Sequence, residues 1–258
     1  MRCRKYWKTD KSVDSPESFT QRQLILDRKP FLQKLYRDWA EAIVSHCTTG
    51  VSVELGGGLN SVTASVFKKI GCYRLDITEL TELSVRGDAK CLPFRSGSLS
   101  NLVAIDALHH FSDVHQFLSE AIRTLSPGGR VILIEPWNSR WARFVFRFHH
   151  EEYNADAGWT LPAGGPMSSS NLALPWIVFC RDIERFQISY PELEMIQVKV
   201  ITPLGFVLSG GSTVGFGLPG FLYPMIRVID SLLQRFGLGL SALIVIQRRR
   251  WTDGWIGK

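Results

Sequence analysis

Short apolar runs alternate with segments of helical periodicity through the middle of the chain. Residues 51–55, 101–105 and 130–134 are β-prone runs with the length of buried strands. Between them, apolar residues recur at helical spacing over 61–70 and 114–125. Strands that alternate with helices form parallel sheets covered on both faces, so the pattern predicts an α/β fold.

The pattern extends on both sides of this region. The polar residues 1–18, with Ser15-Pro16 as a breaker, predict a loosely ordered arm, and a helix is expected from Pro30. Strands are predicted at 72–77, near 83–85, at 194–201 and at 241–247, with helices at 172–186 and 220–236. The turn signal Ser126-Pro127-Gly128-Gly129 precedes the strand at 130–134. Residues 137–170 have no sustained period, which favours a lid or binding segment.

Composition narrows the function classes. The net charge of +6 comes from dispersed basic residues with short clusters near both ends, which does not indicate nucleic-acid binding. Five cysteines without CxxC pairing suggest no metal site and no disulfide framework. The N-terminus has no apolar signal-peptide core, so we expect a cytoplasmic protein.

The C-terminal third is unusually apolar. Residues 204–246 are interrupted by glycines, prolines and Asp230, so a membrane-spanning helix is disfavoured. Two interpretations stay open for this region: core plus an ordinary surface helix, or peripheral contact with the inner face of a membrane.

A glycine turn after the first strand is the first candidate binding feature. Gly56-Gly57-Gly58 would let the backbone approach a ligand closely. A dinucleotide fingerprint requires a third glycine at the position of Ser61, which is absent. Glu54 would repel a pyrophosphate, so a zwitterionic, cationic cofactor suits this turn better.

Two carboxylates follow at the ends of later strands. Asp76 lies 20 residues beyond Gly56 and can accept hydrogen bonds from ribose hydroxyls. Asp88, followed by Ala89, comes after a further turn and could pair with an adenine amino group.

In order, these motifs resemble the Rossmann-like S-adenosylmethionine-dependent methyltransferases of the type 11 family. The resemblance covers residues 50–137 and rests on the following segments: Glu54-Leu55-Gly56-Gly57-Gly58, Asp76, Gly87-Asp88-Ala89-Lys90-Cys91-Leu92-Pro93-Phe94, Asp106-Ala107-Leu108-His109-His110-Phe111, Leu125-Ser126-Pro127-Gly128-Gly129-Arg130 and Glu135-Pro136. It implies a seven-stranded, mostly parallel sheet flanked by helices, with an N-terminal helical extension and an inserted lid after the fifth strand.

The resemblance also implies S-adenosyl-L-methionine as the cofactor and assigns contacts to it. The cofactor-binding residues would be Glu54, Gly56, Gly57, Gly58, Asp76, Asp88, Ala89 and Asp106. The N-terminal arm and helix would occupy 1–48, the cofactor-binding half 49–137, and the substrate-side segment with the C-terminal strands 138–258.

Two residues depart from the family pattern. Asn60 replaces the third loop glycine, and because asparagine tolerates left-handed backbone angles we expect the turn to survive. Asn101 replaces an acidic residue at the start of the fourth strand, a position without a direct cofactor role. The link from Asp76 to Asp88 is short, so the helix between strands two and three is expected to be reduced or absent.

The residues on the substrate side suggest a general base. His149, His150 and His110 are the candidate catalytic residues, since histidine is the natural base for a hydroxyl acceptor. Structural or solvated roles for these histidines stay open. The near-helical series Arg140, Arg143 and Arg147 would be either a solvated face or a grip on phosphate.

A second resemblance, to bacterial methyltransferases associated with surface-polysaccharide gene sets, implies the acceptor class. It rests on Glu135-Pro136-Trp137, His149-His150-Glu151, Gly158-Trp159, Ala173-Leu174-Pro175-Trp176 and Leu208-Ser209-Gly210-Gly211. It implies O-methylation of a sugar or glycan-type acceptor carried on a lipid or a nucleotide. The alternatives are a soluble small-molecule acceptor and, from another class, a non-catalytic cofactor-binding partner at the membrane. The sequence leaves the oligomeric state open.

Overall fold

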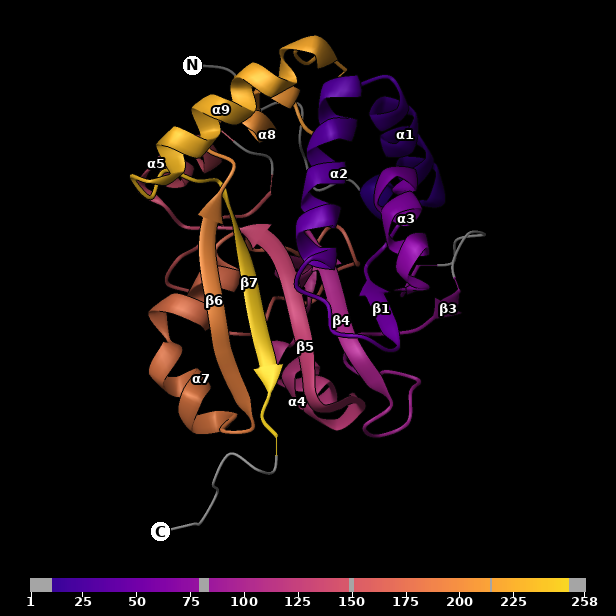
Figure 1. Ribbon diagram of the computed structural model, residues 1–258. Helices are drawn as coiled ribbons and strands as arrows, with labels where there is room; N and C mark the ends of the chain where they lie inside the picture. Colours follow the sequence, from indigo (N-terminus) through magenta and orange to yellow (C-terminus); the bar gives the residue numbers. More distant parts are fainter. Residues whose placement is uncertain (1–10, 79–83, 149–150, 214, 251–258) are drawn as a thin grey trace.

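The computed structural model describes residues 11–78, 84–148, 151–213 and 215–250. Its seven strands are β1 (Ser52–Leu55), β2 (Tyr73–Asp76), β3 (Val85–Arg86), β4 (Leu99–Ile105), β5 (Leu125–Pro136), β6 (Leu193–Ile201) and β7 (Ser241–Arg248). They form one sheet in the order β3-β2-β1-β4-β5-β7-β6 (Figure 1). The first five strands are parallel, and β7 is antiparallel to both β5 and β6. The predicted α/β fold with a seven-stranded, mostly parallel sheet is confirmed.

Helices surround this sheet. The α-helices are α1 (Pro16–Asp27), α2 (Pro30–Val44), α3 (Ser61–Phe67), α4 (Val114–Thr124), α5 (Arg140–Phe146), α6 (Leu174–Trp176), α7 (Ile183–Ser189), α8 (Gly205–Ser209) and α9 (Tyr223–Gln234). The shorter turns are η1 (Lys11–Asp14), η2 (Lys68–Ile70), η3 (Leu108–His110), η4 (Ile177–Arg181) and η5 (Gly220–Leu222). The described chain between β2 and β3 contains no assigned helix, but residues 79–83 lie outside the description.

Alternate strand residues pack against opposite helical layers. Leu102 and Leu133 contribute to a core with α4, η4 and α7, whereas Val103 and Ile132 contribute to a second core with α2 and α3. This alternation follows from the two-residue period of a strand, and it explains why the central runs are apolar at every position.

Two local predictions are wrong. Residues 11–18 are not a loose arm: Ser15 caps α1 by accepting from the Ser18 amide, and Phe19 is buried. Ser15-Pro16 therefore begins a helix, because proline suits the first helical turn. The turn signal at 126–129 lies within β5 as an irregularity, where the pairing steps from Leu99 opposite Leu125 to Asn101 opposite Arg130.

The carboxyl ends of the parallel strands lie at one edge of the sheet. The loops after β1, β2, β4 and β5 meet there, and α1, α8 and α9 lie toward the same end of the molecule (Figure 1). In open α/β sheets ligands bind outside the carboxyl ends of the strands, so this edge is the place to seek a site.

Candidate active site

The glycine turn after β1 has the close packing that its sequence predicts. Gly56 and Gly58 adopt left-handed φ angles of 65° and 50°. A side chain at Gly56 would also place its Cβ 2.8 Å from Cβ of Ala107, and one at Gly57 would lie 2.8 Å from a carboxylate oxygen of Glu54. Positive φ angles and lack of space thus explain why residues 56–58 are glycines.

Glu54 supports this turn from beneath. Its carboxylate accepts from Nε of Arg74 at 2.8 Å and from the Thr63 hydroxyl at 3.1 Å, and it is buried. Arg74 also donates to the carbonyl oxygens of Gly57 and Gly58. The Glu54–Arg74 pair therefore fixes the backbone of the loop. Sequence reasoning did not assign a role to Arg74, although a charged residue within a buried strand was a signal.

Asn60 adopts a conformation that differs from the one expected. Its φ is −65°, so it does not use the left-handed region, and its side chain accepts from the amides of Val62 and Thr63. Asn60 is therefore the N-cap of α3. Asparagine is among the favoured caps, which gives a physical reason for its presence in place of glycine.

The two predicted carboxylates reach the same cavity. Asp76 accepts from the Gly58 amide at 3.0 Å and from the Thr78 amide at 2.8 Å. Asp88 lies 3.5 Å from Nζ of Lys90, a cavity-lining residue that sequence reasoning did not assign. A carboxylate has about four lone-pair sites, so each retains acceptor capacity for a ligand.

A cavity of about 650 Å³ joins these residues to the substrate side. All the predicted cofactor-binding residues line it, namely Glu54, Gly56, Gly57, Gly58, Asp76, Asp88, Ala89 and Asp106. Its other part is rich in apolar side chains, namely Val145, Phe146, Phe148, Met167, Leu172, Phe206, Val207 and Leu240. The part that holds these carboxylates is here called the polar half, and the part beside α5 and α8, where Ser212 and Thr213 also line the cavity, the apolar half.

The turn after β4 is anchored by a carboxylate from β5. Glu135, fully buried, accepts from the amides of Ala107 and Leu108 at 2.8 and 2.7 Å. Asp106 precedes them with a left-handed φ of 51°. Burial raises the pKa of Asp106 to about 7; the His109 charge opposes this shift, whereas Glu135 and Glu151 add to it.

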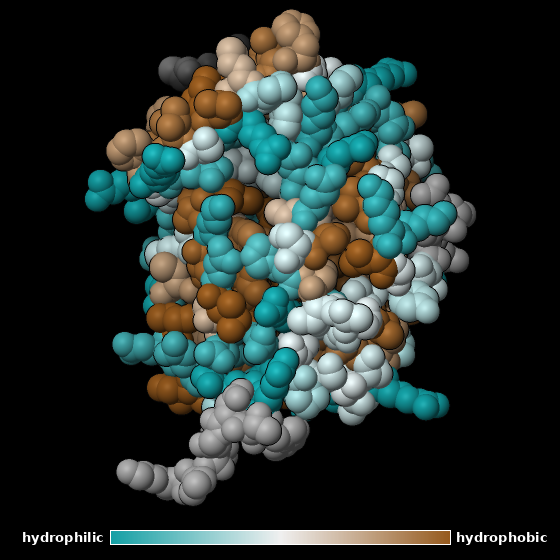
Figure 2. Space-filling model, viewed as in Figure 1, coloured by the Kyte–Doolittle hydropathy of each residue, from teal (hydrophilic) through white to brown (hydrophobic). Residues whose placement is uncertain are grey.

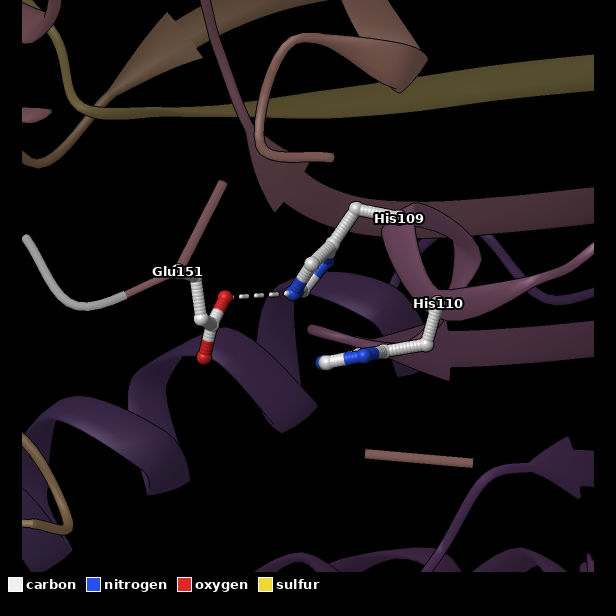
Figure 3. A group of neighbouring side chains, drawn as sticks. All are labelled: His109, His110 and Glu151. Carbon is white, nitrogen blue, oxygen red and sulfur yellow. Dashed lines mark ion pairs between the residues drawn. The ribbon is translucent and has the colours of Figure 1, made fainter. Parts of the chain in front are cut away.

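His109 lies between two carboxylates. Its Nδ1 is 2.8 Å from Glu135 and its Nε2 is 3.3 Å from Glu151 (Figure 3). Burial alone would lower the pKa of His109, but the hydrogen bonds and negative charges of the two glutamates outweigh it and raise the pKa to about 10. His109 is therefore an imidazolium near neutral pH and cannot act as a base.

His110 has the opposite environment. Burial and the positive charge of His109 lower the pKa of His110 to about 4, so this ring is neutral near neutral pH. Its Nδ1 lies 3.0 Å from the Ser169 carbonyl oxygen, which accepts only, so Nδ1 carries the proton. Nε2 then keeps its lone pair, and His110 lines the cavity.

The other two predicted bases are not placed. His149 and His150 lie outside the described residues, so their assignment stays a prediction. Arg140, Arg143 and Arg147 are exposed around α5 and none of them lines the cavity.

Among the described residues, one group has ligand atoms close enough to suggest a metal site. His109, His110 and Glu151 offer atoms within 4.8 Å of one another (Figure 3). A metal ligand must be deprotonated, whereas the two glutamates hold protons on both nitrogens of His109. We therefore interpret the group as an ion-paired charge cluster.

The N-terminal segment covers the polar half of the cavity, which sequence reasoning did not predict. Phe19 and Arg22 of α1 line the cavity. The side-chain amide of Gln23 donates to the Ser61 hydroxyl and accepts from the Ser61 backbone amide. Asp14 accepts from the amide of Met167 at 2.6 Å. The segment thus bridges the start of α3 and the loop before residue 170.

Comparison with known proteins agrees with this geometry. Residues 54–133 match the methyltransferase domain family. This stretch of the chain is thus similar to a methyltransferase domain. The uncharacterized protein YafE of Escherichia coli (strain K12) is 30% identical over 87 residues, which cover 31% of this chain and 42% of that protein. The matched stretch thus spans less than half of that relative.

Solved structures share the fold of the methyltransferase domain at low sequence identity. A possible histamine N-methyltransferase from Thermotoga maritima aligns with TM-score 0.56 and 15% identity, covering 93% of this chain and 99% of that one. Geranyl diphosphate C-methyltransferase from Streptomyces coelicolor A3(2) aligns with TM-score 0.53 and 16% identity, covering 84% and 82%. The fold is the Rossmann-like fold of S-adenosylmethionine-dependent methyltransferases.

The residues of the polar half fit S-adenosylmethionine. The loop at 56–58 leaves room for close backbone approach. Asp76 at the end of β2 offers acceptors suited to ribose hydroxyls, and Asp88 with Ala89 forms the wall where adenine would lie. Asp106 is placed to face a cationic group. S-adenosylmethionine is the cofactor that the match to the methyltransferase domain family implies.

Proposed function

We propose that the protein transfers a methyl group to a hydroxyl of a sugar or glycan-type acceptor, with His110 as the general base. The observation that carries this is the neutral His110 ring, which has its proton on Nδ1 and lines the same cavity as the cofactor residues. When bound, S-adenosylmethionine supplies an electrophilic methyl carbon on a sulfonium.

The residues of this chain act around that carbon. Nε2 of His110 accepts the hydroxyl proton as the oxygen–carbon bond forms and the carbon–sulfur bond breaks. The charged His109, fixed by Glu135 and Glu151, keeps His110 from protonating in the ground state. The products are the methyl ether, S-adenosylhomocysteine and a proton on His110, which solvent removes.

A lipid carrier is favoured over a nucleotide carrier by the apolar half of the cavity. A nucleotide diphosphate would place charge against Phe146, Leu172 and Leu240, whereas a polyprenyl or acyl chain would bury apolar area there. The geranyl diphosphate C-methyltransferase, crystallised with geranyl diphosphate, has the same fold, so an amphiphilic acceptor is compatible with it. We place the activity in the cytoplasm, at the inner face of the membrane.

The test is incubation with methyl-labelled S-adenosylmethionine and two acceptor panels. One panel contains polyprenyl-phosphate-linked sugars and the other nucleotide diphosphate sugars. Label in the lipid panel supports the proposal, and label only in the nucleotide panel overturns the lipid carrier. Label in neither panel overturns the sugar acceptor, and cofactor binding without label in either panel favours a non-catalytic binding role.

His110→Gln tests the base within the same assay. We expect turnover to fall about 100-fold or more, the usual contribution of a general base, while S-adenosylhomocysteine binds within about twofold of wild type. The parallel variant His149→Ala/His150→Ala serves as the comparison. If only that variant loses turnover, the base lies in the 149–150 pair and the assignment to His110 is wrong.

A further inference from the structure

Helix α9 leaves a continuous apolar strip uncovered. Its buried residues face the protein, whereas Val228, Leu232 and Phe236 are 61%, 51% and 77% exposed. Val228 and Leu232 are four residues apart and lie along one line of the helix, and Phe236 follows just after the helix ends at Gln234. Further exposed apolar side chains extend the strip, namely Phe216, Phe221, Met225 and Ile229. Figure 2 shows hydrophobic surface gathered over α9 at the upper left of the view.

Helix α5 adds a second exposed apolar strip at the same end of the molecule (Figure 1). Phe144 and Phe148 are 53% and 78% exposed and contact each other edge to face. On its inner side, Phe146 packs with Leu240, which follows α9. The two helices thus lie at the same end of the molecule, and their exposed surface is here called the α5–α9 face.

The charges on this face are of one sign. The exposed charged residues described on α5, on α9 and at the residues just after them are all arginines, namely Arg140, Arg143, Arg147, Arg227 and Arg235. Of these, Arg227 forms an ion pair with Asp38 of α2 at 2.9 Å. The one acidic residue of α9, Asp230, is turned inward and accepts from the amides of Leu204 and Gly205. Exposed phenylalanine and leucine beside arginines, without exposed carboxylates, is the pattern of a helix that lies in a membrane interface.

The face adjoins the mouth of the cavity. Phe148, exposed two residues after the end of α5, also lines the cavity, as does Val207 of α8, which is 42% exposed. A chain that rests on the face would therefore meet the apolar half of the cavity without crossing solvent.

We propose that the α5–α9 face docks on an anionic lipid bilayer. Charge complementarity selects this occupant, because a second copy of the chain would oppose arginines to arginines, whereas anionic headgroups neutralise them. No helix in the described ranges is long and apolar enough to span a bilayer. In this proposal α5 and α9 lie on the bilayer surface. The delivery of a lipid-linked acceptor to the cavity mouth rests on the proposed function, but the docking itself does not.

The test is co-flotation of the full chain with vesicles. Vesicles of 30% phosphatidylglycerol in phosphatidylcholine are compared with vesicles of phosphatidylcholine alone, at about 0.1 M and 0.5 M salt. We expect binding to the anionic vesicles, with about fivefold loss for each arginine replaced by glutamate and a loss at high salt. The variant Val228→Ser/Leu232→Ser/Phe236→Ser should reduce binding at least tenfold.

A matched control tests whether an exposed apolar side chain elsewhere on the molecule contributes to vesicle binding. Ile188 of α7 is 81% exposed at the opposite end of the molecule, so Ile188→Ser should bind vesicles like wild type. Lys68→Glu is the matched control for charge. Thermal unfolding of each variant checks that the changed side chains, all at the surface, leave the fold intact.

The outcomes are distinct. Equal binding by the triple variant and wild type, or no binding of wild type to anionic vesicles, overturns the docking surface. If wild type dimerises with rising concentration, the triple variant does not, and neither binds vesicles, a second copy of the chain is the occupant. That outcome also overturns the proposal of a lipid-docking surface. S-adenosylhomocysteine binding and methylation of a short-chain acceptor in solution report on the proposed function independently of docking.

Discussion

At the residue scale, two adjacent histidines differ in charge because their rings face different partners. His109 lies between Glu135 and Glu151, which raise its pKa to about 10, while His110 donates to a backbone carbonyl and has its pKa lowered to about 4. The sequence His-His could not reveal this, because the partners come from β5 and from residues 151 and 169. Arg74 is different, because a charged residue within a buried strand was a signal that sequence reasoning did not use.

Asp106 provides a pH-dependent prediction. Its pKa of about 7 means that it loses its proton as pH rises through neutrality, and the carboxylate then attracts the cofactor's ammonium group. We expect S-adenosylhomocysteine to bind about tenfold more tightly at pH 7.5 than at pH 5.5. Isothermal titration calorimetry at both pH values measures this change.

Asp106→Asn is the control for this prediction, because it has the same shape and no charge to titrate. Its affinity should vary little over the same range. If wild type and Asp106→Asn show the same pH dependence, the titrating group is another one in the cavity.

At the element scale, most strands and helices were predictable because their apolar positions repeat with a period of two or of about 3.6. The breaker signals were less reliable. Ser15-Pro16 starts α1 instead of ending structure, and Gly128 lies in an irregular part of β5 with φ of 85°. A proline or glycine signals a backbone angle, and the neighbouring packing decides whether that angle is a turn, a cap or a bulge.

The start of α3 gives a prediction at this scale. Asn60 satisfies two amides at the helix terminus, so Asn60→Ala should lower the free energy of unfolding by about 1 kcal/mol. Urea unfolding followed by circular dichroism measures the change. Asn60→Asp, which keeps the accepting oxygen, should remain near wild type.

Asn60→Gly separates the cap from the turn. Since φ at residue 60 is −65°, glycine gains no conformational relief there and should cost only a few tenths of a kcal/mol. A clear gain in stability or in cofactor affinity with glycine would show that the backbone at residue 60 is strained and that the cap is not its main role.

At the scale of the whole molecule, the cavity is assembled from segments distant in the sequence. The glycine loop and Asp76 were predictable because ordered motifs in the first half specify them. The cover formed by η1 and α1 was not, since the contacts of Gln23 with Ser61 and of Asp14 with Met167 arise only when this N-terminal segment folds over the sheet edge. Cofactor binding and closure of this cover should therefore be coupled.

Limited proteolysis tests that coupling. Trypsin can cleave after Arg22 and Arg28, which lie in and just after α1, and Arg22 lines the cavity. A ligand that packs against α1 lowers the population of opened states, so S-adenosylhomocysteine at about 100 times its Kd should slow cleavage at these sites by up to about 100-fold. Mass spectrometry identifies the fragments, and cleavage after Lys69, remote from the cavity, is the internal control. Protection confined to α1 shows closure over the cofactor, whereas equal protection at Lys69 would show only global stabilisation and would contradict a cover that closes locally.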